Sequence, residues 1–267
     1  MLFRSDPAAA KYERGRLLVM AGSAAYRGAA HLALAGATSA GVGSLRAIVP
    51  SAVADQLWMV LPHVVLETRP LEDGALDRLD AVLVGPGLGQ APVPERGGAG
   101  GREPWWAALQ AFRGLLVVDA DGLHRLTPAW LGERAGPTWI TPHAGEFRRL
   151  FPDLADLPPL EAAPAAARLC GVTVLLKGAR SVVAAADGRR WQLMEACGAA
   201  ARAGLGDGLA GYAAGLGARV VAEWASGGGD SGAVAGVDAR WLALAALDHA
   251  QAGCQAARDL EIGRAHV

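Results

Sequence analysis

The feature that most constrains the fold is the alternation of short apolar runs with longer, alanine-rich segments of helical spacing. Strands are expected at residues 16–21, 44–49, 81–84, 115–118, 138–140, 172–176 and 181–185, with 190–194 as a hairpin partner. Helices are expected at residues 26–40, 52–61, 105–112, 161–169, 205–221 and 238–257. This alternation predicts an α/β chain with three α/β/α layers and a mostly parallel sheet.

Several of the expected strands end in glycines or polar side chains. Gly22-Ser23, the turn 85–89 (GPGLG), the segment 119–123 (DADGL) and the segment 141–147 (TPHAGEF) each follow an apolar run. In open α/β sheets, ligands bind beyond the carboxyl ends of the strands. We therefore expect a binding site at this edge of the sheet.

The segment 203–211 (AGLGDGLAG) is the strongest local signal for chemistry. Its glycines, Gly204 and Gly206 among them, immediately precede a long apolar helix. Glycines let backbone N–H groups converge, and a helix N-terminus adds positive potential, so the segment predicts an anion pocket suited to phosphate. Asp207 at its mouth could take a proton from an attacking hydroxyl. The alternative is an ordinary aspartate that caps the helix.

Lysine is scarce in this chain, which makes each lysine informative. The chain has 25 lysines and arginines together, of which only Lys11 and Lys177 are lysines, and it has no asparagine. Lys177 ends an apolar run and is followed by Gly178 and Ala179. It could meet a nucleotide phosphate as a point charge. The alternative is a solvated lysine in a turn.

Two further segments offer side chains to the same edge. In 141–147, His143 could donate to a ligand, and Glu146 could bond back to the helix start. The alternative is a capping arrangement in which His143 merely packs. In 119–123, Asp119 and Asp121 could hold magnesium through water or cap the following turn. The turn 85–89 permits close backbone approach to a ligand.

The composition excludes several classes of protein. A chain of 267 residues with 52% apolar and 19% charged residues is not mainly disordered, and a formal net charge of −1 argues against a dedicated nucleic-acid binder. No apolar run is long enough to cross a membrane, so no membrane partner is expected. The three cysteines have no metal or redox spacing, which favours the cytoplasm. No Walker loop, serine-hydrolase elbow or zinc spacing is present, and no metal-ligating residue is assigned.

The two ends resemble sequencing-adapter translations, so residues 1–5 and 261–267 are expected to be foreign to the natural protein. A single domain is then expected over residues 6–260, with a surface loop or lid at 91–102. A missing neighbouring domain stays open on either side.

Taken together in order and spacing, these motifs resemble the ADP/ATP-dependent NAD(P)H-hydrate dehydratase family, which has a ribokinase-like fold. The resemblance covers nearly the whole chain, from about Lys11 to Cys254, and rests on Gly22-Ser23 with 26–30 (YRGAA), 85–89, 119–123, 141–147, 176–179 (LKGA) and 204–211. That family repairs hydrated NADH and NADPH, and it uses a nucleotide to drive the loss of water.

The resemblance implies roles for particular residues. Asp207 matches the catalytic aspartate, which also lies near the damaged nicotinamide. The implied nucleotide-binding residues are Lys177, Gly178, Ala179, Gly204 and Gly206. The implied substrate-binding residues are Ala37, Gly87, His143 and Asp207.

The resemblance also implies cofactors and partners. The cofactor would be ADP or ATP, accompanied by Mg²⁺. The abundance of Gly, Ala, Arg and Pro suggests a GC-rich bacterial genome, and bacterial members of the family tend to use ADP, so ADP is favoured. An epimerase domain would be fused or encoded nearby, and the apolar Ala/Leu helices would suit a homo-oligomer.

Three departures from the family pattern leave two other functions open. Leu205 stands where the family usually has a hydroxyl residue, Cys197 where an asparagine is expected, and Arg202 where a threonine is expected. These losses fall on the nucleotide side, so one alternative is a catalytically impaired nucleotide-binding homologue. The other is a ribokinase-like kinase for a vitamin precursor.

Overall fold

A computed structural model describes residues 10–68, 74–89, 105–194, 201–226 and 237–259. The two terminal segments, the expected loop at 91–102 and Cys197 lie outside these described residues. The expected domain bounds of 6–260 are therefore not tested at either end.

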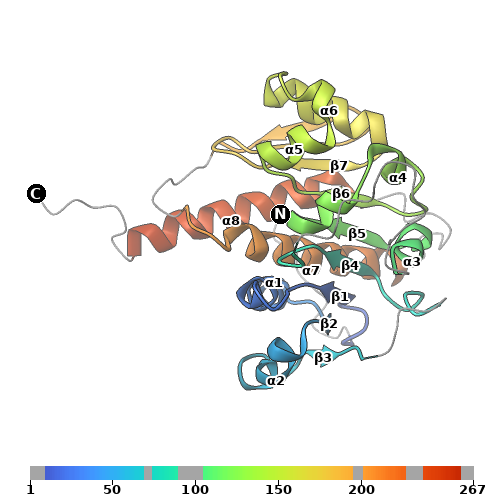
Figure 1. The fold of residues 1–267 in the computed structure, drawn as a ribbon, viewed down its shortest axis with the longest axis vertical. Coiled ribbons are helices and arrows are strands. Elements are labelled where there is room, and N and C mark those ends of the chain that lie inside the picture. Colours follow the sequence, from blue (N-terminus) through green and yellow to red (C-terminus); the bar gives the residue numbers. More distant parts are fainter. Residues whose placement is uncertain (1–9, 69–73, 90–104, 195–200, 227–236, 260–267) are drawn as a thin grey trace, which may run out of the picture.

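The sheet that the sequence predicts is present, and it is mostly parallel. The strands are β1 (Arg16–Met20), β2 (Ser44–Ile48), β3 (Val65–Leu66), β4 (Ala81–Val84), β5 (Leu115–Val118), β6 (Thr138–Ile140), β7 (Thr173–Leu176), β8 (Val182–Ala184) and β9 (Arg190–Gln192). Their order is β3-β2-β1-β4-β5-β6-β7-β8-β9, parallel from β3 to β7 and antiparallel from β7 to β9. Figure 1 shows the parallel strands side by side in this order.

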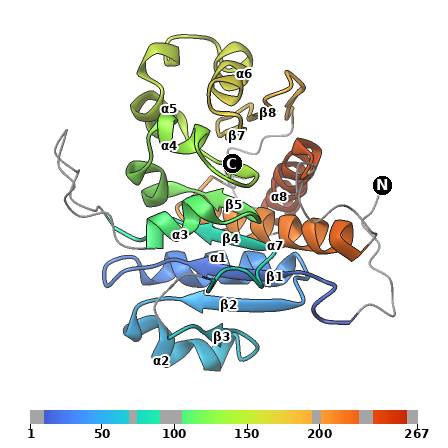
Figure 2. The same cartoon turned by 90° about the vertical axis from the view of Figure 1, so that its right-hand side faces the viewer.

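Helices cover both faces of the sheet, as Figures 1 and 2 show. Leu17 and Val19 of β1 point to one buried cluster, while Leu18 and Met20 point to the other. The first cluster packs under α1 (Arg27–Ser39), α2 (Ser51–Val60), α7 (Leu205–Ser226) and α8 (Ala239–Asp259). The second packs under α3 (Trp105–Ala111), α4 (Pro128–Gly132), α5 (Ala144–Leu150) and α6 (Pro159–Cys170). The three-layer architecture is therefore confirmed.

Element boundaries differ from the sequence expectation where local signals are weak. Helix α7 continues to Ser226, past the predicted end at residue 221. The short elements β3 and α4, and the 3-10 helices η1 (Ala120–Arg125) and η2 (Pro152–Leu154), were not predicted. Such short pieces carry too few residues to show a periodic pattern.

Helices α1 and α7 touch backbone to backbone, and only glycine allows this. A Cβ on Gly36 would lie 2.2 Å from the carbonyl oxygen of Gly208, and a Cβ on Gly211 would lie 1.9 Å from the carbonyl oxygen of Ala33. Real Cβ atoms never approach backbone so closely, so any side chain at these positions would push the helices apart. The contact fixes the first turn of α7 relative to α1.

This packing predicts that Gly211→Ala destabilises the protein. The added methyl must displace the backbone of α1, and overpacking of this kind costs about 1–3 kcal/mol. Gly208→Ala is a matched control in the same helix, because a Cβ there meets nothing within 4 Å. Thermal unfolding should show a clear loss for Gly211→Ala and no loss for Gly208→Ala, whose better helix propensity is worth up to about 1 kcal/mol. Equal melting temperatures for the two variants would contradict the packing argument.

Candidate functional site

The site lies at the point in the sheet where successive strands stop being added on one side of β1 and start being added on the other. From β1 the chain moves outward through β2 and β3, and it then returns to build β4 to β7 on the other side of β1. Crevices beyond the strand ends at such a switch point are the usual ligand sites of open α/β sheets. The N-terminal turns of α1 and α7 pack at the same edge as the segments that follow β4, β5 and β7.

The glycine turn after β4 packs tightly against the start of α1. The N–H of Gly22 donates to the carbonyl oxygen of Pro86 at 2.7 Å, which joins the ends of β1 and β4. Gly87 has φ +64°, and a Cβ on it would lie 2.6 Å from the Cβ of Ala29. The close backbone approach that the sequence predicts is therefore present, and α1 is the neighbour that requires it.

Asp121 links this turn to the rest of the site. Its Oδ2 accepts a hydrogen bond from the N–H of Gly89 at 2.9 Å. Asp121 also lies close enough to Asp207 for its charge to influence that carboxyl. The 85–89 turn and the first turn of α7 thus face the same volume.

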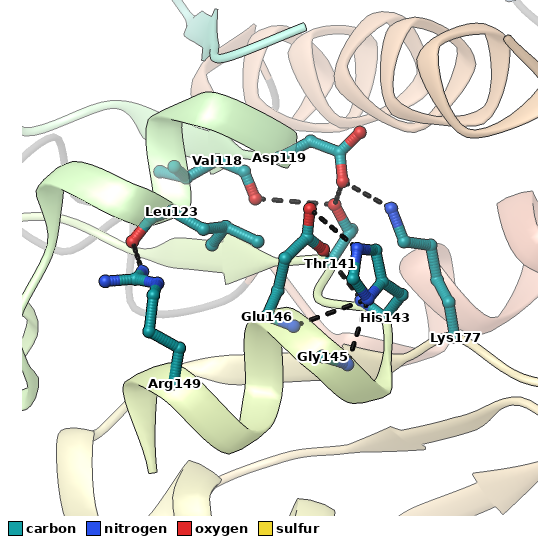
Figure 3. Close-up of polar contacts among 9 residues, drawn as sticks. All are labelled: Val118, Asp119, Leu123, Thr141, His143, Gly145, Glu146, Arg149 and Lys177. Atoms are coloured by element: carbon teal, nitrogen blue, oxygen red, sulfur yellow. Dashed lines mark hydrogen bonds and ion pairs between the residues drawn. The ribbon is translucent and has the colours of Figure 1, made fainter. Parts of the chain in front are cut away.

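A buried ion pair occupies the centre of the site (Figure 3). The Nζ of Lys177 donates to Oδ1 of Asp119 at 2.6 Å, and the hydroxyl of Thr141 donates to the same oxygen at 2.7 Å. Asp119 is only 1% exposed. Burial disfavours the Lys177 ammonium, but the charges of Asp119, Glu146 and Asp207 outweigh it and raise the pKa of Lys177. Lys177 is therefore not a solvated lysine in a turn.

His143 caps α5 (Figure 3). Its Nδ1 accepts hydrogen bonds from the N–H groups of Gly145 and Glu146, while the N–H of His143 donates to Oε2 of Glu146 at 2.8 Å. The predicted bond from Glu146 back to the helix start is confirmed. A parallel bridge places His143 beside Lys177. The imidazole is 60% exposed, so it can still reach a ligand, and its contact to the hydrated cofactor stays a prediction.

The N-terminus of α7 lies where the sequence predicts an anion pocket. Gly204 has φ +90°, a conformation that L side chains rarely adopt, and α7 begins at the next residue. The first N–H groups of a helix have no partner within it and carry partial positive charge. A Cβ on Gly206 would lie 3.5 Å from the Nζ of Lys177. The ammonium thus lies against this turn, and the exposed Gly178 and Ala179 follow it directly.

Asp207 lies in the first turn of α7 and is hard to ionise. Burial first, and then the negative charge of Asp119, raise the pKa of Asp207 to about 6. Lys177 opposes the shift, and Asp121 adds to it. A carboxylate with a pKa just below neutrality is a suitable general base.

The structure brings most of the predicted site residues together, with one exception. Lys177 lies against Gly206 and close to Asp207, and His143 lies beside Lys177. The turn that holds Gly87 is bonded through Gly89 to Asp121, whose charge reaches Asp207. Ala37 does not join them, because it is fully buried where α1 packs against α7, and a Cβ on Gly215 would lie 2.8 Å from its carbonyl oxygen. Its position shows no surface that a ligand could contact.

The sequence analysis missed the role of Asp119 in this site. Asp119 was expected to hold magnesium or cap a turn, but its side chain makes no capping bond, and Oδ1 is taken by Lys177 and Thr141. Within the ranges that the structure covers, no three His, Cys, Asp or Glu side chains gather into a metal site.

The raised pKa predicts that Asp207→Asn makes the protein more stable at neutral pH. In the folded protein Asp207 holds its proton up to about pH 6, whereas the ordinary pKa of an aspartate is 3.8. The free energy of unfolding therefore falls as pH rises from about 4 to 6, because ionisation of this carboxyl is harder in the folded state than in the unfolded state. With allowance for solvent screening, the gain from asparagine should be about 1–2 kcal/mol above pH 6, a few degrees in melting temperature, and should vanish near pH 4.

The matched control for this prediction is Asp187→Asn. Asp187 is an exposed carboxylate whose pKa is lowered by its bonds to Arg189, so its removal should not raise the melting temperature at pH 8. An Asp207→Asn variant that melts at or below the parent temperature at pH 8 would contradict the charge environment described here.

Comparison with known proteins places these features in a family. The family described as NAD(P)H-hydrate dehydratase matches residues 17–259. A bifunctional NAD(P)H-hydrate repair enzyme from Gloeobacter violaceus is 41% identical over 215 residues, which cover 75% of this chain and 40% of that protein. The ADP-dependent (S)-NAD(P)H-hydrate dehydratase of Xanthomonas campestris is 33% identical over 235 residues, covering 80% of this chain and 75% of that enzyme.

Solved structures agree with the fold. The ADP/ATP-dependent NAD(P)H-hydrate dehydratase of Bacillus subtilis, co-crystallized with ATP/Mg²⁺, superposes with a TM-score of 0.69 and 26% identity over 96% of this chain and 94% of that one. A ribokinase-like superfamily protein from Enterococcus faecalis superposes with a TM-score of 0.74 at 20% identity, over 96% of this chain and 84% of that one, which shows the fold alone.

The chain spans about two fifths of the length of the bifunctional relatives it matches (40% of the Gloeobacter protein). Among the described residues, no helix is both long and apolar enough to cross a membrane. With its fold, its motifs and the match over residues 17–259, the chain belongs to the NAD(P)H-hydrate dehydratase family.

Proposed function

We propose that this chain dehydrates hydrated NADH or NADPH at the expense of a nucleotide, ADP or ATP. The observation that carries the proposal is Asp207, a carboxylate with a pKa of about 6 in the first turn of α7, with the Lys177 ammonium against the same turn. A proton acceptor thus lies beside a positively charged pocket that suits phosphate. The named activity of the Xanthomonas relative supports this reading.

The first chemical step is phosphoryl transfer to the ring hydroxyl. Water is a poor leaving group, whereas phosphate is a better one. Asp207 accepts the hydroxyl proton as that oxygen attacks the terminal phosphorus of the nucleotide, and the bond from that phosphorus to the bridging oxygen breaks. The N–H groups at the start of α7 and the Lys177 ammonium stabilise the charge on the transferred group.

The second step restores the nicotinamide ring. The lone pair of the ring nitrogen expels the phosphate, and the neighbouring ring carbon then gives up a proton to water, so the double bond forms again. The net reaction removes one water from the substrate and hydrolyses one phosphoanhydride bond.

Magnesium would enter with the nucleotide rather than bind to a preformed protein site. The Bacillus relative was crystallised with ATP/Mg²⁺, and magnesium bound to nucleotides keeps several waters and phosphate oxygens as ligands. Because the described carboxylates form no cage, no step of the mechanism is assigned to the metal.

An epimerase is the partner activity that this reaction calls for. The Xanthomonas relative is named for the (S) epimer, so the opposite epimer needs interconversion before repair. The Gloeobacter relative is named bifunctional and is longer than this chain, which supports an epimerase that is fused or encoded nearby. We infer that the chain works in the cytoplasm, where the nucleotide and the damaged cofactor occur together.

The proposal predicts turnover that depends on Asp207 and on pH. Incubation with hydrated NADH and either ADP or ATP should restore NADH absorbance. The rate should rise with pH through about 6, because only ionised Asp207 accepts a proton. Asp207→Asn should retain nucleotide binding and lose about 10²–10⁴-fold in rate.

The same assay separates the alternatives. Nucleotide binding without any recovery of NADH would favour an impaired homologue. A phosphorylated vitamin precursor, formed when such a compound is supplied, would favour the kinase. Activity of Asp207→Asn within a factor of a few of the parent would contradict the role of this aspartate.

Leu205 gives a separate prediction on the nucleotide side. It is the first residue of α7, between Gly204 and Gly206, and it places an apolar group beside the anion pocket. A serine hydroxyl could bond a phosphate oxygen, and a hydrogen bond to a charged group contributes about 1.5–3 kcal/mol. Leu205→Ser should therefore strengthen nucleotide binding or speed turnover about tenfold, measured by titration calorimetry and initial rates. Unchanged values for both would mean that backbone N–H groups alone form the pocket.

A further inference from the structure

Asp119 is a buried carboxylate that the mechanism above does not use. It follows β5 directly, is 1% exposed, and receives hydrogen bonds at Oδ1 from Lys177 and Thr141 (Figure 3). A buried charge is costly unless it is paired, and the pair must also satisfy its remaining hydrogen bonds. Because Asp119 is shielded from solvent, it cannot itself contact a nucleotide. Any role in the reaction must therefore act through its partner.

The partner is a lysine whose backbone is fixed and whose long side chain is not. The N–H of Lys177 donates to the carbonyl oxygen of Pro142 at 2.8 Å, which anchors the residue at the end of β7. A four-carbon stem leaves the ammonium free to swing unless it is held. The bond to Asp119 holds it, and the held position lies against Gly206 in the first turn of α7.

We propose that Asp119 is a positioning residue for the nucleotide: it fixes the Lys177 ammonium against the first turn of α7, where the phosphates would bind. This inference rests on the proposed function, because it assumes that the anion pocket of α7 holds the nucleotide. The ammonium has three donors, of which Asp119 takes one, so the others can face a phosphate oxygen. A phosphate arriving there meets a charged donor already in place.

Asp119 has a second effect on the same site, through charge. The charged groups that face Asp207 are Asp119, Lys177 and Asp121, and the negative charge of Asp119 follows burial as a cause of its raised pKa. The same carboxylate keeps Lys177 protonated against the effect of burial. Removal of the Asp119 charge should therefore change the titration of both functional groups.

A merely structural ion pair would predict something different. A clamp between the ends of β5 and β7 would affect the free energy of unfolding. Nucleotide affinity would then be the same with and without Asp119, although the loss of its charge would still shift the titration of Lys177 and Asp207. Nucleotide affinity, and its dependence on Lys177, therefore separates positioning from structural support.

The main experiment is a double-mutant cycle with Asp119→Asn and Lys177→Met. Calorimetric titration with ADP or ATP should show that each single variant binds at least tenfold more weakly than the parent. If Asp119 acts through Lys177, the double variant should bind as Lys177→Met does, with no further loss. Asp119→Asn leaves an unpaired buried ammonium and could fail to fold. The double variant removes both buried charges, so it should fold even in that case. Independent, additive losses would overturn the proposal.

A matched control is Thr141→Val, which removes one hydrogen bond from the same carboxylate oxygen but no charge. The acidic limb of the pH–rate profile should have the same midpoint in Thr141→Val as in the parent protein. In Asp119→Asn it should move to lower pH, because Asp207 loses a neighbouring negative charge. An acidic limb that does not move in Asp119→Asn would contradict the charge effect.

A chemical measurement avoids any need for turnover. The chain has only two lysines, so acetylation by acetic anhydride at pH 8 followed by mass spectrometry compares Lys177 with Lys11 as an internal reference. In Asp119→Asn, burial without the Asp119 charge should lower the pKa of Lys177 and raise its reactivity relative to Lys11. An unchanged ratio together with unchanged nucleotide affinity would overturn the proposal.

The outcomes distinguish this inference from the proposed function. If the parent binds nucleotide but does not restore hydrated NADH, the proposed function fails, while a loss of affinity in Asp119→Asn still supports positioning. If the parent turns over and Asp119→Asn only melts at a lower temperature, the proposed function stands and positioning fails. A parent that binds no nucleotide overturns both.

Discussion

The backbone contact between α1 and α7 is the constraint on which the site depends. Gly36 and Gly211 let the two helices approach more closely than any side chain would permit. Both helices begin at the edge where the parallel strands end, so this contact sets the distance between their first turns. One of these turns carries Asp207 and lies where the anion pocket is predicted, and the other supports the glycine turn at 85–89. The glycines in the middle of α7 thus serve packing, and under the proposed function those at its start serve nucleotide binding.

Negative charges outnumber positive charges around Lys177, because one ammonium faces several carboxylates. Lys177 lies near Asp119, Glu146 and Asp207, and of these only Asp119 is bonded to it. Among the described residues no cation is bonded to Asp207, which is partly buried, so its ionised form is costly. Under the proposed function, the same property that lowers stability would let Asp207 accept a proton near neutral pH. A nucleotide phosphate would add negative charge there, so the proposed pocket would need a helix N-terminus as well as a lysine.

Local sequence predicts what neighbouring residues do together, and it fails where distant residues meet. The alternation of strands and helices gave the layers, and the spacing of His143 and Glu146 gave the helix cap, since both depend on residues a few positions apart. The pairing of Lys177 with Asp119 could not be predicted this way, because 58 positions separate them and β6 lies between their strands. Ala37 likewise matches a family position, but its burial depends on Gly215 of a helix far along the chain.

The space around residue 177 favours a lysine over an arginine. Of the 25 basic residues, 23 are arginines, so the chain strongly prefers arginine elsewhere. At position 177 the cationic nitrogen lies 2.6 Å from Asp119, and a Cβ on Gly206 would come within 3.5 Å of it. A planar guanidinium is wider than an ammonium and presents its donors in a rigid fork, so it would press on the first turn of α7. A compact ammonium fits between a buried carboxylate and a glycine helix start, and it leaves donors free for a phosphate.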